Sequence, residues 1–564
     1  MRAKELIIAV ALISLTWNIS AQEETVPPRF PNGRPEVCFR FATPSPSVLR
    51  NISAVISIDK VKGDSVYAYA NTREFAGFVR LGIPYTEMPA PSMLHHYKMH
   101  GLTKGTQTWD AYPTYHSYLQ TMQEFAASYP ALCTLDTLGR SVNQRLLLSM
   151  KLSGKPAVNG PKPEVMQSST IHGNEPSGTV FMLELIDYLT RNYQKDSLVT
   201  RLLDSLDIYI NPLVNPDGLY FSSDSDVYGA TRENANSVDL NRNFPDPIDG
   251  PHPDGNSYQP ETQAMMSFYN THHILISSMY HEGSEVLNYP WDSQQKRHPD
   301  EKWFIAISKV YADSAQYYGP PGYFTSITPS GYVDGWDWYL VYGGLQDYST
   351  YFRGDRDITI EINDTKTPPG DQLPIYWNAL YRSFLHYFEN AFYGLHGTLR
   401  DSASLQQLNA KIELPSIDMD SSWVYSTNGT FYRFRAGDTT DLLVTAPGYD
   451  SLRLRNVIIS DQKQTRLDIL MHKSGTQGVE LITAGSTIRF YPNPFDAVIK
   501  LEMSSNVSLP VHIVVYDVSG RRCLEQTLQS GFMQVDASGL KPGLYLLSVY
   551  KGSIPLASGR MVKL

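Results

Sequence analysis

His172 and Glu175 form a pair of side chains that could bind one metal ion. They stand three residues apart in "SSTIHGNEPSGTVFMLELIDYL", between an apolar run and a helical pattern. Imidazole and carboxylate groups are both ligands that Zn²⁺ accepts. Pro176 follows where a helix can begin, since a proline in the first turn loses no hydrogen bond. The pair is therefore predicted at a strand-to-helix turn, where both side chains can point at one ion.

An H-x-x-E pair is a weak signal by itself, because most histidines are structural. A catalytic zinc takes three protein ligands and leaves one position for water. His281, at the end of "HILISSMYH", supplies a candidate third ligand. In parallel sheets, ligands gather at the carboxyl ends of strands, where His172 and His281 are both predicted. His272 and His273 suit this role less well, because they precede their strand.

Glu361 is the candidate base for the zinc water. The run "DITIEIND" places it in a β-branched strand, on the face opposite Ile358, Ile360 and Ile362. A solvent-facing glutamate on an edge strand is the alternative, and for an isolated strand it is the more common one. Three candidate ligands elsewhere in the same region favour the catalytic interpretation.

Two arginines stand close together in "ATRENANSVDLNRNFPD", where Arg232 precedes Asn241 and Arg242. Arginines in a loop are usually surface residues. A guanidinium group, however, binds a carboxylate through two parallel hydrogen bonds. These residues are therefore candidates for binding an anionic group of a substrate.

Elements that position these residues alternate between helical and apolar strand patterns from Trp109 onward. Strands that are apolar on both faces and separated by helices predict a mostly parallel sheet with helices on both faces. From Gly394 the pattern changes to short alternating strands separated by Gly, Asp, Asn and Ser, which predicts two small all-β sandwich domains. We place boundaries at 1–21, 22–105, 106–393, 394–475 and 485–564, and assign no role to residues 22–105.

The length, charge and cysteine content of the chain argue against several classes of protein. The chain has 564 residues, which is more than one hydrophobic core usually organises. Lys+Arg 47 against Asp+Glu 57 gives a net charge of −10, which argues against a nucleic-acid partner. Its three cysteines, Cys38, Cys133 and Cys523, predict neither a disulfide framework nor a thiolate metal cluster. A bound metal must then be held by histidine and carboxylate.

The first residues, "MRAKELIIAVALISLTWNISAQ", carry Arg2 and Lys4 ahead of a short apolar run. Small residues follow, as in a secretory signal peptide, and the run is too short to span a membrane. An N-terminal strand is the alternative. Because no later apolar segment has a spanning length, we expect an exported, soluble mature protein.

Several motifs together resemble the zinc metallocarboxypeptidases of the M14 family, in the carboxypeptidase N/E branch. They are "HGNEP", "NPLVNPDG", "RENANSVDLNRNFPD", "MYHEGSEVLNYPWD", "WYLVYGGLQDYSTY" and "DITIEI", which occur in the family's order over roughly Trp109 to Tyr393. The resemblance implies an α/β fold with a mixed sheet. It also implies one Zn²⁺ per chain, held by His172, Glu175 and His281.

The same resemblance implies roles for further residues. Asp239 would orient the first histidine, and Arg242 with Asn241 would hold the terminal carboxylate of the substrate. Arg232 would polarise the scissile carbonyl and stabilise its oxyanion. Glu361 would take a proton from the zinc water and pass it to the departing amine.

Tyr339 resembles the mobile tyrosine that closes over the terminal residue, with Tyr332 and Tyr342 as neighbours that could be mistaken for it. Asp292 and Gln346 match the positions that the branch uses to bind a C-terminal Lys or Arg, where an acid would pair with the basic side chain. The branch has small residues where this chain has "HEGSE". Glu285 in that run could reshape the pocket.

Both β-rich segments resemble known domains. "GLHGTLRDS" and the strands after it are similar to the transthyretin-like sandwich that follows the catalytic domain in this branch. "RFYPNPF", "VHIVVYDVSGR" and "GLKPGLYLLSVYKG" resemble the C-terminal sorting domain of the type IX secretion system. That resemblance implies export through the periplasm to the cell surface or medium, with the secretion machinery as a partner.

The sequence thus predicts an exported, monomeric zinc exopeptidase that removes Lys or Arg from the C-termini of peptides or proteins. A peptidase or amidase acting on cell-wall peptides is the alternative within the same chemistry. A second alternative is a binding protein on an inactive fold, although the ligands and the glutamate are all present. A third is a surface adhesin that functions through its β domains.

Overall fold

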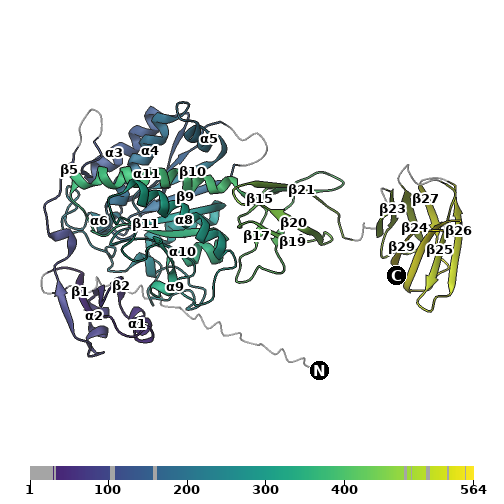
Figure 1. Ribbon diagram of the computed structural model, residues 1–564, viewed down its shortest axis with the longest axis horizontal. Coiled ribbons are helices and arrows are strands. Elements are labelled where there is room, and N and C mark those ends of the chain that lie inside the picture. The colour runs from purple at the N-terminus through teal and green to yellow at the C-terminus, as the bar shows by residue number, and fades with distance from the viewer. Residues whose placement is uncertain are drawn as a thin grey trace, which may run out of the picture.

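The computed structural model describes residues 30, 33–101, 108–155, 162–474, 479–483, 486–503, 509–529, 532–552 and 554–564. The predicted signal peptide at 1–21 lies outside these residues and stays a prediction, as do the predicted domain boundaries. We refer below to the N-terminal unit (residues 33–88), the α/β unit (109–392), the sandwich unit (394–471) and the C-terminal unit (486–563). Figure 1 shows them following one another along the coloured chain.

A sheet of eight strands forms the centre of the α/β unit, in the order β13-β12-β14-β11-β9-β10-β8-β7. The strands are β7 (Cys133–Arg140), β8 (Leu146–Leu152), β9 (Glu164–Ser169), β10 (Asp207–Asn211), β11 (Ile274–His281), β12 (Ser284–Tyr289), β13 (Tyr332–Asp334) and β14 (Asp357–Asn363). The central strands β14, β11, β9 and β10 are parallel, and β8 and β7 pair antiparallel with their neighbours. β12 pairs antiparallel with β14 and parallel with β13. The predicted mixed, mostly parallel sheet is confirmed.

Helices cover both faces of this sheet. They are α3 (Tyr115–Ser128), α4 (Ser177–Asn192), α5 (Ser197–Ser205), α6 (Pro216–Leu219), α7 (Pro260–Thr271), α8 (Glu301–Tyr318), α9 (Gly335–Trp338), α10 (Leu345–Tyr348) and α11 (Leu373–Glu389). One core packs α3, α4, α5, α8 and α11 against the sheet, and a second packs α7 and α10 against the other face. Strands β11 and β14 are buried along their whole length, as strands covered on both faces must be.

The strands that the sequence pattern did not predict lie toward the edges. β7 ends the sheet and alternates between buried and exposed residues. β12 follows β11 after a turn at Gly283 and pairs antiparallel with β14, so it runs in the direction opposite to β11. Their short or partly polar segments carry a weak periodic signal, and pairing with already formed neighbours decides their conformation.

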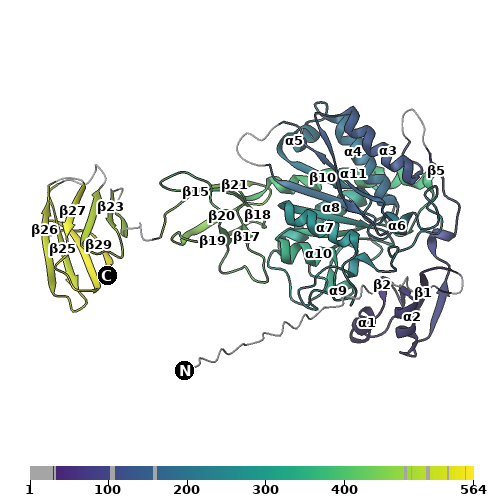
Figure 2. The ribbon, with the colours of Figure 1, turned by 180° about the vertical axis from the view of Figure 1, so that it is seen from behind.

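The N-terminal unit is an antiparallel sheet in the order β2-β3-β1-β4 with two helices. Its elements are β1 (Glu36–Ala42), α1 (Pro46–Ser53), β2 (Ser57–Lys62), β3 (Ser65–Asn71), α2 (Thr72–Val79) and β4 (Tyr85–Met88). It has a core of its own, in which Phe39, Ile58 and Phe78 are fully buried. Figures 1 and 2 both place this purple unit against the side of the α/β unit near α9.

Two β units follow the α/β unit. The sandwich unit contains β15 (Gly394–Asp401), β16 (Lys411–Glu413), β17 (Val424–Tyr425), β18 (Thr430–Arg433), β19 (Asp438–Thr445), β20 (Leu452–Ile459) and β21 (Gln464–Met471). The C-terminal unit contains β23 (Ser486–Tyr491), β24 (Val498–Met503), β25 (Val511–Asp517), β26 (Arg522–Leu528), β27 (Phe532–Asp536), β28 (Gly543–Lys551) and β29 (Ile554–Lys563), with β22 (Val479–Thr483) at its edge. Each unit consists of two sheets around one apolar core, so the predicted all-β folds are confirmed.

Candidate active site

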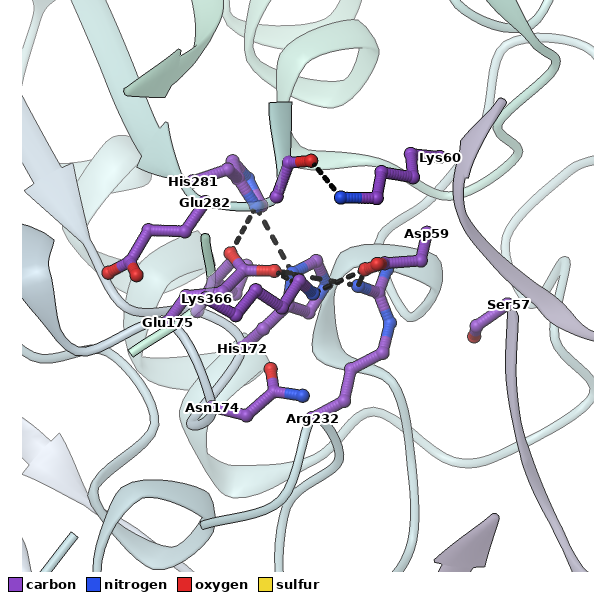
Figure 3. Close-up of polar contacts among 12 residues, drawn as sticks. Ser57, Asp59, Lys60, His172, Asn174, Glu175, Arg232, His281, Glu282 and Lys366 are labelled. Carbon is purple, nitrogen blue, oxygen red and sulfur yellow. Dashed lines mark hydrogen bonds and ion pairs between the residues drawn. The ribbon is translucent and has the colours of Figure 1, made fainter. Parts of the chain in front are cut away.

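The three predicted metal ligands lie together at the carboxyl ends of two adjacent parallel strands. His172 follows β9, Glu175 precedes α4, and His281 is the last residue of β11. The Nδ1 atom of His172 lies 3.0 Å from Oε1 of Glu175, and the Nδ1 atom of His281 lies 2.9 Å from Oε2. Figure 3 shows both rings turned toward the carboxylate between them. All three side chains are buried.

This cluster fits a zinc ion. One donor atom from each residue lies within 4.8 Å of the others, and two imidazoles with one carboxylate form a donor set typical of catalytic zinc. Burial would raise the pKa of Glu175, but His172, Lys366 and His281 lower it well below its usual value. Burial lowers the pKa of His281 to about 4. The carboxylate is therefore charged and that imidazole neutral, as metal ligation requires.

Asp239 holds His172 in this orientation. Its Oδ1 atom lies 3.1 Å from Nε2 of His172, which leaves Nδ1 to face the cluster. Its other oxygen accepts hydrogen bonds from Nε of Arg232 at 2.9 Å and from Oγ of Ser57 at 2.7 Å. A carboxylate behind a metal-binding histidine fixes both the ring and its tautomer.

The turn that carries His172 and Glu175 depends on close backbone packing. A Cβ atom added to Gly173 would lie 2.1 Å from the carbonyl carbon of Gly218, so only glycine fits there. Pro176 is the residue that precedes α4, close to its predicted place at the helix start. The carboxylate of Glu282, beside His281, accepts a hydrogen bond from the backbone N–H of Ser177 and so satisfies the start of the helix.

Glu361 lies beside His281, because the two residues are partners in the parallel pairing of β14 with β11. Ile358, Ile360 and Ile362 point into the core on the opposite face, as the alternation predicts. Burial and the negative charge of Glu175 raise the pKa of Glu361 well above its usual value. Its Oε2 atom has no hydrogen-bond partner among the described residues.

Arg232 and Arg242 are both buried and belong to the segment between α6 and α7, and Arg232 reaches the cluster. Nη1 of Arg232 lies 3.6 Å from Oε1 of Glu175. Nη1 of Arg242 donates to the backbone oxygen of Asn241 at 2.9 Å, and its buried Nε has no partner among the described residues. The amide oxygen of Asn241 accepts a hydrogen bond from the N–H of Leu345 at 3.0 Å.

Asp292 and Gln346 form a buried acidic position, which Gly344 separates from the side chain of Asn241. Nε2 of Gln346 donates to Oδ1 of Asp292 at 2.9 Å, while its own oxygen accepts the N–H of Thr359 at 2.7 Å. A Cβ atom on Gly335 would lie 1.9 Å from Oδ1 of Asp292, so a side chain there would collide with the carboxylate. Burial and the neighbouring Asp347 raise the pKa of Asp292 well above its usual value.

Tyr339, Tyr342 and Glu285 each lie in a different part of the structure. The hydroxyl of Tyr339 donates to the backbone oxygen of Asp59 at 3.4 Å, and Tyr342 lines a cavity of about 350 Å³ together with Arg242. Glu285 is the cross-strand partner of Ile362, so it lies on the face of the sheet opposite Glu361. Its Oε2 atom accepts the N–H of Phe324, and Glu285 does not face Asp292.

Two charged residues at this site were not singled out from the sequence. Nζ of Lys366 lies 2.7 Å from Oε1 of Glu175 and also pairs with the carboxylate of Asp59. Asp59 belongs to β2 of the N-terminal unit, and Figure 3 shows it directed at Arg232. A lysine and an aspartate in polar segments carry no motif, so only the tertiary contact identifies them.

A mixed α/β sheet that carries a buried His–Glu–His cluster beside a glutamate is the arrangement of a zinc metallohydrolase. The family described as "Zinc carboxypeptidase" matches residues 118–383. Carboxypeptidase M from Mus musculus is 31% identical over 345 residues, which cover 58% of this chain and 77% of that protein. The chain belongs to the zinc carboxypeptidase family, M14.

Other relatives match over different shares of their length. Carboxypeptidase D from Rattus norvegicus is 32% identical over 372 residues, which cover 63% of this chain and 26% of that protein. This chain therefore spans about a quarter of the carboxypeptidase D relatives. The crystal structure of carboxypeptidase A from Helicoverpa armigera is 18% identical, with a TM-score of 0.49, and covers 63% of this chain and 97% of that one.

A second match falls at the other end of the chain. The family described as "Secretion system C-terminal sorting domain" matches residues 489–562, within the C-terminal unit. This domain indicates export through type IX secretion. Among the described residues, no helix combines the length and the apolar character that crossing a membrane requires.

Proposed function

We propose that this protein is an exported metallocarboxypeptidase that hydrolyses the C-terminal peptide bond of peptides and preferentially releases Lys or Arg. The observation that carries this proposal is the buried pair of Asp292 and Gln346, next to the loop of Arg242 and the His–Glu–His cluster. Among the described residues, no cation lies within ion-pair distance of the Asp292 carboxylate, which lies against Gly335, and such a carboxylate suits a long basic side chain. The secretion route through the periplasm to the cell surface or medium belongs to the same proposal.

His172, Glu175 and His281 would hold the metal in this reaction. A zinc ion there would act as a Lewis acid and lower the pKa of water. Glu361 accepts a proton from the attacking water and returns it to the nitrogen of the departing amine. A buried carboxylate with one unpartnered oxygen, directly beside His281, suits this transfer.

Arg232 and Arg242 act on different groups of the substrate. Arg232, whose Nη1 lies near Glu175, stabilises the negative charge that develops on the scissile carbonyl oxygen. Arg242 and Asn241 bind the terminal carboxylate, and the free Nε of Arg242 supplies a donor for it. Binding the carboxylate sets the position of the last peptide bond, so the enzyme removes one residue at a time.

Hydrolysis of matched peptides ending in Arg, Lys, Leu or Glu tests the function. The zinc-loaded full chain is incubated at high concentration, and the ratios between released residues are compared. We expect Arg and Lys to be released fastest. Glu361→Gln should reduce every rate by about 100-fold or more while one zinc per chain is retained, because the metal ligands are untouched.

The pocket is tested in the same assay with Asp292→Asn. This variant should lower the ratio of Arg to Leu release by about tenfold or more, because the basic side chain loses its buried partner. Asp337→Asn, which removes an exposed carboxylate from α9, is the matched control and should leave the ratio unchanged. Hydrolysis of muropeptides alone would replace the basic-peptide proposal with the cell-wall alternative.

A further inference from the structure

Glu282 directly follows the metal ligand His281 but does not belong to the metal cluster. Among the described residues, the donor atoms that lie within 4.8 Å of one another are those of His172, Glu175 and His281. Figure 3 shows the Glu282 side chain directed away from them. The residue is nevertheless only 2% exposed. Burying a carboxylate is costly unless it is hydrogen-bonded, so its partners indicate why it is there.

The first partner of Glu282 is the start of helix α4. The first N–H groups of a helix have no acceptor within the helix, and a polar side chain just before the helix usually supplies one. Pro176 occupies that position before α4 and offers no side-chain acceptor. Instead, Oε1 of Glu282 accepts the N–H of Ser177, the first residue of the helix. The neighbour of one metal ligand therefore caps the helix that begins just after another, Glu175.

The second partner is the loop that follows β14. Oε2 of Glu282 accepts the N–H of Thr367 at 3.0 Å. Thr367 has a φ of 52°, a left-handed conformation that β-branched residues rarely adopt and that surrounding contacts must hold. Its hydroxyl donates to the backbone oxygen of Asn174 at 3.1 Å, in the turn between His172 and Glu175. The loop is thus held against the turn that binds the metal.

The same loop carries Lys366, which reaches a metal ligand. Nζ of Lys366 donates to Oε1 of Glu175 at 2.7 Å. The loop also continues β14, the strand of the proposed base Glu361. Through its two oxygens, Glu282 therefore joins three segments of the site: the end of β11, the start of α4 and the loop after β14.

We propose that Glu282 is a positioning residue of the zinc site, which fixes Glu175 and the loop of Lys366 relative to His281 by accepting two backbone N–H groups at once. It acts through the backbone of these segments and not on the substrate. The expected effect on zinc affinity concerns the metal site alone, whereas the expected effect on peptide hydrolysis rests on the proposed function.

Two full-length variants separate position from charge. Glu282→Asp keeps the charge but is one methylene shorter, so it reaches at most one of the two N–H groups. Glu282→Gln keeps the length but turns an NH₂ group toward one of them. Both should lower the zinc affinity by about tenfold or more, measured by competition with a coloured chelator, since groups behind metal ligands affect affinity by about 10- to 100-fold.

Glu285→Gln is the matched control. Its carboxylate also accepts one backbone N–H, at 3.1 Å, but from Phe324, which lies in no metal-binding segment. The same isosteric change three residues along the chain should therefore leave the zinc affinity unchanged. A general loss of stability would affect this control and the Glu282 variants alike.

Hydrogen–deuterium exchange tests the two contacts without relying on catalysis. Both Glu282 variants should increase exchange in peptides covering 174–181 and 364–370. Glu285→Gln should increase exchange only around residue 324. An unchanged pattern in β9, β11 and β14 would show that each variant is folded.

Hydrolysis of Arg-ended peptides at saturating zinc adds a split between kcat and KM. In the Glu282 variants, kcat should fall about tenfold or more, because small displacements of reacting groups are costly. KM should change little, since the hydrogen bonds of Glu282 do not involve Asn241, Arg242 or Asp292.

The outcomes separate this inference from the proposed function. If both Glu282 variants bind zinc as tightly as the wild type, the positioning role is wrong and the peptidase function stands. If only Glu282→Gln loses affinity, charge and not position is responsible, and the role is again wrong. If both lose affinity while the zinc-loaded wild type releases no residue from any peptide, the proposed function fails and the positioning of the metal ligands stands.

Discussion

The charged groups at this site contact charged or polar partners from other segments of the chain. Asp239 contacts His172, Arg232 and Ser57 at once, so the orientation of a metal ligand is coupled to the position of Arg232. Isolated buried charges would be costly, and the alternation of cations and anions compensates for their burial. The site is therefore one network in which few side chains act alone.

Replacing Asp239 with asparagine should weaken zinc binding without removing a ligand. His172 would lose the charged acceptor at Nε2, and outer partners of this kind affect metal affinity by about 10- to 100-fold. Competition with a coloured chelator measures the change. Asp249→Asn, an exposed position in the same loop, is the control, and equal affinities for the two variants would contradict this role of Asp239.

The turn after β9 and the helix α6 after β10 position the metal ligands, because a glycine in each lets the two backbones come into contact. Gly173, between His172 and Glu175, packs on Gly218 within the short helix α6, which follows β10. Parallel pairing of β9 with β10 and β11 brings these carboxyl ends to one edge of the sheet. The ligand positions therefore follow from backbone packing as much as from side-chain chemistry.

Gly173→Ala should disrupt this element. The added methyl group would meet the Gly218 backbone at 2.1 Å, which forces the turn to move and costs about 1–3 kcal/mol or more of unfolding free energy. We expect zinc content to fall and the urea midpoint to decrease. Gly101→Ala, where a Cβ atom meets nothing within 4 Å, should change neither. Full zinc content in Gly173→Ala would refute this account.

Over the whole molecule, a buried ion network joins the sandwich unit to the α/β unit. Arg433 of β18 is fully buried and pairs with Asp300, just before α8, and with Asp418. Nη2 of Arg356 lies 2.8 Å from the same Oδ2 atom of Asp300 that Arg433 contacts. Charges this deeply buried hold the two units together only while each has its partner.

Arg433→Met should leave the buried carboxylate of Asp418 without a cation and remove one of the cations that surround Asp300. We expect a loss of about 3–5 kcal/mol in unfolding free energy, measured by urea denaturation at neutral pH. Arg466→Met, which breaks an exposed pair in the same sandwich unit, should change stability by less than about 1 kcal/mol. Similar losses in both variants would contradict the importance of the network.

Because of the same ion network, we expect the stability of the protein to decrease at acidic pH. Burial would raise the pKa of Asp300, but Arg433 and Arg356 lower it below its usual value. A carboxylate with a lowered folded-state pKa stabilises the protein above its unfolded pKa of about 4, and this contribution is lost as pH falls further. The wild type should therefore lose stability below about pH 4 more steeply than Arg433→Met.

The metal site and the elements around it could be predicted from the amino-acid sequence. His172, Glu175 and His281 could be selected because metal ligation needs those residue types at strand ends, and Glu361 because alternation separates it from the isoleucines around it. Helical and apolar periodicity likewise predicted a mostly parallel sheet followed by two β folds. These features depend on residues that are neighbours along the chain, so they can be predicted from the sequence.

The contacts between segments that are far apart along the chain became known only from the folded structure. Asp59 and Lys366 reach Glu175 and Arg232 from segments that carry no motif, and Glu285 turns away from the pocket because of its pairing with Ile362. The segment of residues 22–105 received no role from its sequence, yet its β2 strand covers the site. Contacts between segments far apart along the chain depend on packing and register, which leave no local periodic signal to detect.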